Sequence, residues 1–333
     1  MVERAPRSSS WRIYRYRICM EPSEPRKIRQ YELIERIGEG KTGVVYKAFD
    51  SGQQRVVALK IPHPEVARDP VYDIRAAATL KAVARLDHPN ICHPIDLVEH
   101  GGRLIIVTEF VTGNTIAELV ASGLLPTERC FEITIQIVRG LDHAHHHRIR
   151  HGNIQPSNIM VRTDGQVLLL DFGLPRRLSS RTDDLSAFPL ETIPYVAPEE
   201  IRNQRPHRVG DMFSIGALFC YMLSGVSPFE AATHDGAANA VLYEQPDYDR
   251  IAAHGIPRDM ILLLKMLLAK KKADRCADTD QLLVTLESIA DYFKKRSYQP
   301  DRTATFRSPR LYLLISLLAI LLVLVWSILA GGK

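Results

Sequence analysis

A glycine-rich run near the amino end of the chain has the spacing of a phosphate-binding loop. Gly38, Gly40 and Gly43 fit the pattern G-x-G-x-x-G-x-V, in which missing side chains let backbone amides approach phosphate oxygens. The residues after the glycines, 44–48, have the composition of a strand, whereas a dinucleotide-binding fold would require a helix there. We therefore expect a strand–turn–strand hairpin that holds a nucleotide.

Four other short motifs follow the glycines. They are Val57-Ala-Leu-Lys60, His151-Gly-Asn-Ile-Gln-Pro-Ser-Asn158, Leu170-Asp-Phe-Gly173 and Thr192-Ile-Pro-Tyr-Val-Ala-Pro-Glu199. With the glycine run, they resemble the motifs of eukaryotic-like serine/threonine protein kinases, and the resemblance covers roughly residues 31–292. It implies an α+β, bilobal protein-kinase-like fold with a small β-rich N-lobe and a helical C-lobe.

The resemblance assigns the nucleotide contacts to the N-lobe and the hinge that follows it. Lys60 matches the strand lysine that holds the α- and β-phosphates. Residues 109–111 match the hinge that carries adenine on its backbone, and Val45 and Ala58 match the apolar plates around the base. The expected nucleotide-binding residues are Ile37, Gly38, Gly40, Gly43, Val45, Ala58, Lys60, Glu109 and Val111.

Two oxygen-bearing side chains match the family's metal ligands. Asn158 ends the catalytic-loop motif, and Asp171 begins the Asp-Phe-Gly motif. Hard oxygen ligands combined with phosphate oxygens suit Mg²⁺. We therefore expect ATP and magnesium as ligands, with Asn158 and Asp171 holding the metal.

The catalytic loop departs from the family pattern H-R-D-x-K-P-x-N at three positions. Asn153 replaces the aspartate that accepts the substrate hydroxyl's proton, and Gln155 replaces a lysine that neutralises the transferring phosphate. An amide can orient a hydroxyl but has no basic lone pair at neutral pH. The near-isosteric amides should preserve local packing while removing both charges. Gly152 replaces the arginine that grips a phosphorylated activation loop, so we expect no regulation by that route.

The ion pair of an active kinase also lacks one partner. The family places a glutamate on the first helix to pair with the strand lysine, and Thr79 occupies that position here. No Asp or Glu occurs over residues 74–86, so we expect Lys60 to turn to Asp171 instead.

Other matching positions are architectural. By the resemblance, Asp211 supports the catalytic loop and Arg275 pairs with Glu199. Five histidines, at 143, 145, 146, 147 and 151, invite a metal-site interpretation. Consecutive histidines at a helix end point to different faces, so we do not expect them to converge on a metal.

Hydrophobic patterning predicts the elements that must position these motifs. Strand-like runs cover residues 31–38, 44–50, 55–62, 95–99 and 104–110. Helical spacing covers residues 71–86, 127–147, 211–223, 257–269 and 278–292. We therefore predict an N-lobe over residues 30–110 and a C-lobe over residues 111–293.

An apolar stretch follows the predicted C-lobe. From Leu311 to Leu329 every residue is apolar except Tyr312, Ser316 and Ser327, and a helix of this length reaches across the ~30 Å core of a bilayer. We expect one transmembrane helix over residues 310–330, after a charged tether over residues 294–309. Arginines precede the span, so the kinase-like domain should face the cytoplasm.

Composition limits the other partners. The net charge is +5, but basic and acidic residues are interleaved beyond the basic N-terminal extension of residues 1–29, so we expect no nucleic-acid partner. The first 20 residues contain no continuous apolar stretch and predict no secretory signal. The five cysteines are scattered without a CxxC pair, which is typical of reduced thiols in a cytosol.

Three functions are compatible with this sequence. The first is a membrane-anchored pseudokinase that binds Mg·ATP and signals by conformation and partner binding. The second is an impaired but active serine/threonine kinase that transfers the γ-phosphate to protein hydroxyls. The third is a docking scaffold that binds no nucleotide, which the retained glycines, Lys60, Asn158 and Asp171 argue against. The sequence identifies no protein substrate or partner.

Overall fold

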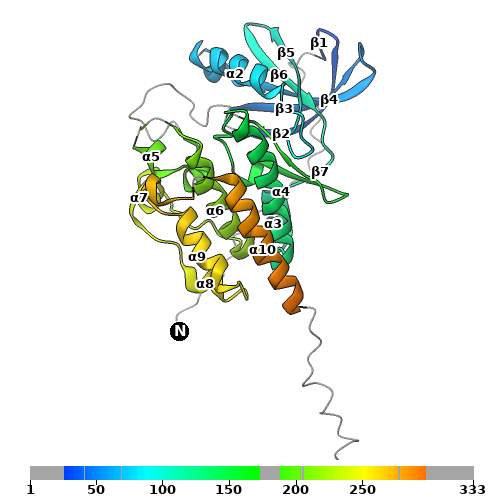
Figure 1. The fold of residues 1–333 in the computed structure, drawn as a ribbon. Coiled ribbons are helices and arrows are strands. Elements are labelled where there is room, and N and C mark those ends of the chain that lie inside the picture. Colours follow the sequence, from blue (N-terminus) through cyan, green and yellow to red (C-terminus); the bar gives the residue numbers. More distant parts are fainter. Residues whose placement is uncertain are drawn as a thin grey trace, which may run out of the picture.

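The computed structural model has a β-rich lobe above a larger helical lobe, as Figure 1 shows. It describes residues 26–40, 42–68, 70–172, 188–202, 204, 206–276 and 278–297. The bilobal α+β fold expected from the sequence is therefore confirmed. The predicted elements are all found, with ends that differ by a few residues; for example, the first long helix ends at Val83 rather than at residue 86.

The N-lobe is built on a six-stranded antiparallel sheet in the order β1-β2-β3-β4-β6-β5. Alternate side chains of the sheet, among them Tyr46, Ala48 and Leu59, are buried in one apolar cluster. The strands are β1 (Lys27–Ile28), β2 (Tyr31–Gly40), β3 (Gly43–Asp50), β4 (Arg55–Pro62), β5 (Pro94–His100) and β6 (Arg103–Glu109).

Two helices follow β4 in the N-lobe. The short α1 (Pro64–Ala67) leads to α2 (Pro70–Val83), the helix that carries Thr79. Ala76 of α2 packs with Val66 and Ile106 in a small apolar cluster. This cluster packs α2 against β6, the strand that pairs with β4 and its Lys60.

The C-lobe is organised around α6 (Val209–Ser224), in which every residue except Tyr221 and Ser224 is buried. A helix that is apolar on all sides belongs inside a core, and α6 carries Asp211 into that core. The surrounding helices are α3 (Ile116–Ser122), α4 (Thr127–His146), α5 (Pro198–Ile201), α7 (His234–Tyr243), α8 (Tyr248–Ala252), α9 (Arg258–Leu267) and α10 (Thr279–Ser297).

The C-lobe also contains a small sheet and short 3₁₀ helices. A three-stranded sheet joins β7 (Gly113–Thr115), β8 (Ile159–Arg162) and β9 (Val167–Leu169). The 3₁₀ helices are η1 (Pro156–Asn158), η3 (Leu190–Tyr195) and η4 (Lys272–Asp274). Thr115 and Glu118 form a capping box at the start of α3, which fixes the chain just after the hinge.

The cysteines of the described residues are free and buried; they are Cys92, Cys130, Cys220 and Cys276. Burial raises the pKa of the Cys220 thiol to about 12, so this group stays protonated and unreactive at neutral pH.

Within the described part of the chain, none of the helices combines the length and the apolar character needed to cross a membrane. The membrane helix expected over residues 310–330 lies outside the described residues, as does the tether from residue 298 onward.

Candidate active site

A cavity of about 450 Å³ is lined by every residue that the sequence analysis assigned to nucleotide binding, metal binding or catalysis. The expected nucleotide-binding residues come from β2, β3, β4, the end of β6 and the segment after it. The expected catalytic and metal-binding residues come from the loop around η1 and from the segment just after β9. The lining includes Ile37, Gly38, Gly40, Gly43, Val45, Ala58, Lys60, Glu109, Val111, Asn153, Gln155, Asn158 and Asp171.

The three glycines of the β2–β3 hairpin differ in what surrounds them. A side chain at Gly43 would collide with the backbone of Ile61 on β4, so packing of the sheet alone requires a glycine there. A side chain at Gly38 or Gly40 would meet nothing within 4 Å. Sheet packing therefore does not explain these two glycines, whereas a ligand that approaches the hairpin backbone would.

Lys60 and Asp171 form an ion pair across the cavity. Lys60 Nζ lies 2.6 Å from Asp171 Oδ2, and this pairing was expected because Thr79 offers no carboxylate. Asp171 has a φ of 56°, in the left-handed region, which turns its side chain out of the line of β9. The ion pair places a cationic and an anionic group together where phosphates and a metal would meet.

The two amides of the catalytic loop bond to each other. Gln155 Nε2 donates to Asn153 Oδ1 at 3.3 Å, which confirms that the neutral pair preserves hydrogen bonding. Asn158 Nδ2 donates to the carbonyl oxygen of Asn153 at 2.8 Å, and His151 Nδ1 accepts from the Asn153 N–H. The loop is thus held in a defined shape, with neutral side chains at the two positions where the family pattern has an aspartate and a lysine.

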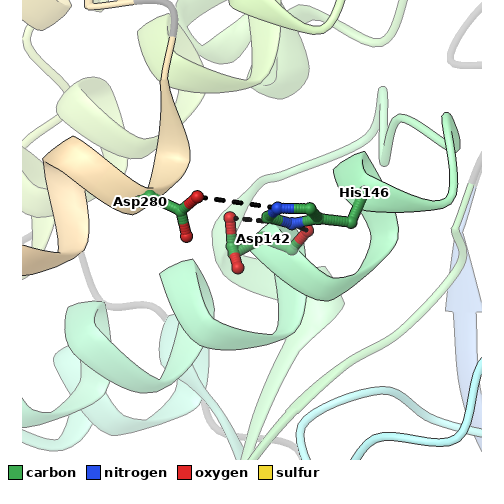
Figure 2. Close-up of side chains that lie close together, drawn as sticks. All are labelled: Asp142, His146 and Asp280. Carbon is green, nitrogen blue, oxygen red and sulfur yellow. Dashed lines mark hydrogen bonds and ion pairs between the residues drawn. The ribbon is translucent and has the colours of Figure 1, made fainter.

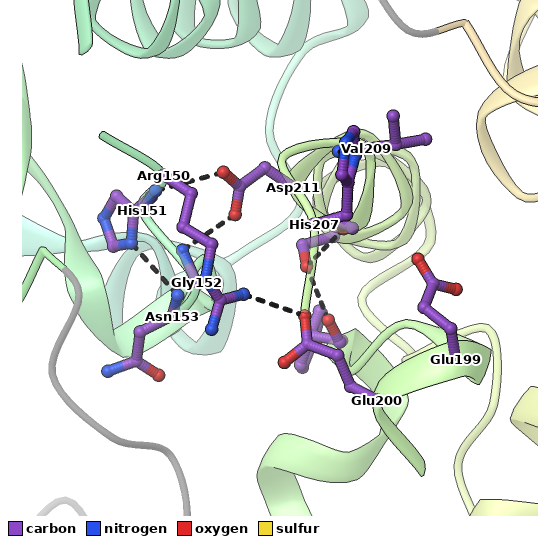
Figure 3. A network of polar contacts seen from close by, with 12 residues as sticks. Arg150, His151, Gly152, Asn153, Glu199, Glu200, His207, Val209 and Asp211 are labelled. Atoms are coloured by element: carbon purple, nitrogen blue, oxygen red, sulfur yellow. Dashed lines mark hydrogen bonds and ion pairs between the residues drawn. The ribbon is translucent and has the colours of Figure 1, made fainter. Parts of the chain in front are cut away.

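Asp211 supports the catalytic loop from below, as expected. Its carboxylate accepts hydrogen bonds from the backbone N–H groups of His151 (3.0 Å) and Gly152 (2.8 Å) and from His145 Nε2 (2.9 Å). Figure 3 shows the two backbone bonds. Burial alone would raise the pKa of Asp211, but the hydrogen bond and the charge of His145 outweigh burial and lower this pKa to about 2.

A second buried anchor holds α5. Arg275 donates from Nη1 and Nη2 to the two oxygens of Glu199, each at 2.7 Å, and the two side chains are 0% and 4% exposed. Burial would raise the pKa of Glu199, but Arg275 outweighs burial and lowers it. The expected Arg275–Glu199 pair is therefore present in bidentate form.

The sequence did not reveal the role of Arg150. Its Nη1 lies 3.1 Å from Glu200 Oε1, and its guanidinium fills the space beside Gly152, which has a φ of 69° (Figure 3). A side chain at position 152 would approach Arg150 Cζ to 3.0 Å. An arginine therefore lies beside the loop although Gly152 has replaced the family's arginine. It is Arg150, and it pairs with the carboxylate of Glu200 on α5.

Other residues of the cavity were also missed from the sequence. Thr115 and Glu118 line it at the start of α3, and Glu191 lines it from η3. None of these three residues lies in a motif that has a recognisable spacing, so only the fold brings them to the site. Glu109, which the sequence did assign to the hinge, accepts a side-chain hydrogen bond from the His93 N–H at 2.8 Å.

Comparison with known proteins places these features among kinases. The family model of the protein kinase domain matches residues 31–285. A probable serine/threonine-protein kinase of Streptomyces coelicolor is 31% identical over 277 residues, which cover 80% of this chain and 41% of that protein. Serine/threonine-protein kinase PknL of Mycobacterium tuberculosis is 30% identical over 291 residues, covering 85% and 72%. The chain therefore spans less than half of the Streptomyces relative.

Solved structures give the same result for the fold. The crystal structure of the Mycobacterium tuberculosis PknI kinase domain matches with a TM-score of 0.66 and 22% identity, over 79% of this chain and 96% of that chain. The structure of Rad53 1–466 in complex with AMP-PNP matches with a TM-score of 0.62 and 25% identity, over 76% and 64%.

Proposed function

Because this chain belongs to the protein kinase domain family, we propose that it is a membrane-anchored serine/threonine kinase-like protein that binds Mg·ATP and acts as a pseudokinase. One observation carries the proposal. The same cavity is lined by the groups that would bind phosphate and metal, and it has a hydrogen-bonded pair of amides at the two positions where kinases carry charged groups for the transfer reaction.

The cavity fits a nucleotide and its metal. Open space above Gly38 and Gly40 leaves the hairpin backbone accessible to phosphates, and Lys60 supplies the cation that they require. Asn158 and Asp171 are oxygen donors of the kind that Mg²⁺ prefers, and they would hold it together with phosphate oxygens. The similar Rad53 structure contains AMP-PNP, which supports an ATP-type ligand in this fold.

The missing charges set what the bound nucleotide can do. Asn153 can orient a hydroxyl but cannot accept its proton, and Gln155 cannot neutralise the transferring phosphate. Losing a general base costs about 10²- to 10⁴-fold in rate. We therefore infer that the chain signals through its nucleotide-dependent conformation and a protein partner.

Mg·ATP binding is tested with the full chain in detergent. We expect Mg·ATP to raise the melting temperature of the wild type and of Asp164→Asn, a matched control in the exposed turn after β8. Asp171→Asn should weaken the increase because a metal ligand loses its charge. An unchanged melting curve in millimolar Mg·ATP would support the docking scaffold instead.

An impaired kinase is the second candidate, because the catalytic loop retains its shape. The Gln155–Asn153 bond and the support from Asp211 hold both positions in place, and phosphoryl transfer depends mainly on positioning and electrostatics. A labelled-phosphate assay on a generic serine/threonine substrate separates the two candidates. Transfer by the wild type that Asp171→Asn abolishes would favour the impaired kinase.

The membrane anchor is proposed from the apolar stretch at residues 311–329 and the arginines before it. Deleting residues 311–333 should move the protein from the membrane fraction to the soluble fraction, with the kinase-like domain on the cytoplasmic side. If the truncated chain stayed with membranes after a high-salt wash, the stretch would not be the sole anchor.

A further inference from the structure

An imidazole and two carboxylates meet in the C-lobe where α10 packs on α4 (Figure 2). None of the three residues lines the cavity of the candidate active site. Asp142 and His146 lie one turn apart at the end of α4, and Asp280 lies in the first turn of α10. One ligand atom from each residue lies within 4.8 Å of the others.

The hydrogen bonds of His146 fix which ring nitrogen is available. His146 Nδ1 lies 3.0 Å from the carbonyl oxygen of Asp142, and because a carbonyl only accepts, Nδ1 must carry the hydrogen. In the neutral ring the lone pair is then on Nε2, which lies 3.5 Å from Asp280 Oδ2, while Nδ1 also lies 3.4 Å from Asp142 Oδ1. Histidines that ligate metals commonly donate their other N–H to a backbone carbonyl in this way.

The first carboxylate is held in position by a neighbouring hydroxyl. Thr279 Oγ1 donates to Asp142 Oδ1 at 2.6 Å, so the residue before Asp280 orients Asp142. His146 and Asp280 are 58% and 63% exposed, which gives an ion access to the cluster and leaves both side chains free to adjust.

The surroundings favour a cation. Among the described residues, the ion pairs of Asp142 and Asp280 are both with His146, and neither carboxylate pairs with a lysine or arginine. The nearby ion pair between the same two helices, Arg139 with Glu287, is already neutral as a pair. The last carbonyls of α4 add negative partial charge at His146.

We propose that His146 Nε2 and the carboxylates of Asp142 and Asp280 bind a zinc-type divalent cation that clamps α10 to α4. An imidazole with two carboxylates suits zinc better than magnesium, which prefers oxygen ligands and water. Ligands at ~2.1 Å from one ion lie closer together than 4.8 Å, so the exposed side chains must draw in by about 1 Å. Water would complete the coordination.

The position of the site gives the clamp a consequence. The C-terminal end of α4 leads into the catalytic loop at His151, and α10 leads toward the proposed tether. A bound cation would therefore stiffen the connection between the cavity and the anchored end of the chain.

Calorimetric titration with Zn²⁺ tests the site, using the chelator-treated full chain in detergent without nucleotide. We expect one equivalent of Zn²⁺ to bind, and His146→Ala or Asp280→Asn to lower the affinity at least ~10-fold. Changing a residue that only hydrogen-bonds to a metal ligand already costs about 10-fold, so losing a ligand should cost at least as much. His147→Ala is the matched control, because His147 is also exposed and also donates Nδ1–H to the carbonyl four residues earlier. Asp171→Asn controls for the ATP cavity.

The controls decide where any zinc binds. The proposal is overturned if the wild type shows no saturable binding, or if His146→Ala and Asp280→Asn bind as tightly as the wild type. It is also overturned if His147→Ala or Asp171→Asn removes the binding. Since no nucleotide is present, failure here is independent of the kinase-like function.

Discussion

The buried support of the catalytic loop and the surface of that loop facing the cavity differ in charge. Behind the site, Asp211 under the loop and the Arg275–Glu199 pair under α5 are charged and engaged in hydrogen bonds. At the cavity, Asn153 and Gln155 are neutral where kinases carry an aspartate and a lysine. The charges that the fold depends on are present, and the charges that only the reaction depends on are replaced.

This difference indicates that the shape of the loop and its chemistry are separable. Removing a buried charge leaves its partner unpaired in a medium of low dielectric, which destabilises the whole lobe. Replacing a charged side chain that faces a solvent-accessible cavity by an amide of similar shape costs little stability. Mutations of the buried support should therefore lower the stability of the fold, whereas mutations at the cavity should change activity and leave stability nearly constant.

The largest expected effect is loss of the buried pair. Arg275→Ala should lower the free energy of unfolding by about 3–5 kcal/mol, because Glu199 and two backbone carbonyls lose their donor inside the core. Chemical denaturation of the full chain measures this change. Arg150→Ala is the control, since its ion pair with Glu200 is 35% and 13% exposed and should contribute below ~1 kcal/mol. Equal losses in the two variants would contradict the assignment of Arg275 to the support.

A smaller effect is expected from titrating the support with acid. The pKa of Asp211 falls from 3.8 to about 2 on folding, so its charge stabilises the fold above pH 3.8, and this contribution is lost as the pH falls toward 2. The contribution amounts to about 2 kcal/mol. Denaturation of the wild type between pH 5 and 3 should show a steeper loss than denaturation of Asp211→Asn. Parallel curves would mean that folding does not lower the pKa of Asp211.

The sequence predicted the fold because hydrophobic period and motif order reinforce each other. Strands such as β4 and helices such as α4 agree with their predicted positions to within a few residues. The Lys60–Asp171 pair was also predictable, because no acidic residue occurs over residues 74–86, where kinases place the glutamate that pairs with this lysine.

What the sequence could not predict depends on contacts between distant segments. The motif around His151 does not show that Arg150 would fill the space beside Gly152. The position of the Arg150 side chain depends on its ion pair with Glu200, which lies on the distant helix α5. Likewise, Asp142 and His146 have helical spacing, but only the packing of α10 on α4 brings Asp280 to them. The membrane helix stays a prediction from hydropathy alone.

Restoring the charges at the cavity should change activity without stabilising the fold. Asn153→Asp with Gln155→Lys returns the proton acceptor and its cationic neighbour, and we expect phosphate transfer to rise more than ~10-fold, short of the full factor of a general base. The labelled-phosphate assay measures the rate, and denaturation should show little change. If the wild type already transfers phosphate as fast, the missing base is not limiting.

Recovery should be limited by the position of Lys60. Asp171 pairs with Lys60 at 2.6 Å, and α2 offers only Thr79 where kinases have a glutamate. Adding Thr79→Glu to the double variant should therefore increase the rate again, by less than the first step. A rate that stays constant while ATP still binds would place the remaining defect outside the lysine pair.

The smallest effect should come from Gly152, which lies between the support and the cavity. Gly152→Ala and Gly101→Ala both place a side chain at a φ near +60°, which costs roughly 1–2 kcal/mol in each case. Only position 152 has a neighbour, because its side chain would approach Arg150 Cζ to 3.0 Å, whereas nothing lies within 4 Å at Gly101. Arg150 is partly exposed and can swing away, so the extra cost of Gly152→Ala should be that of the Glu200 ion pair, below ~1 kcal/mol.

A double-mutant cycle completes this test. In an Arg150→Ala background the difference between Gly152→Ala and Gly101→Ala should disappear, because the side chain at 152 then has the space that the guanidinium occupied. If the difference persists in that background, the strain at position 152 comes from the support through the Asp211 bond to the Gly152 N–H. The loop backbone and its support would then form one rigid unit, and the boundary between stability and chemistry would lie at the side chains of Asn153 and Gln155.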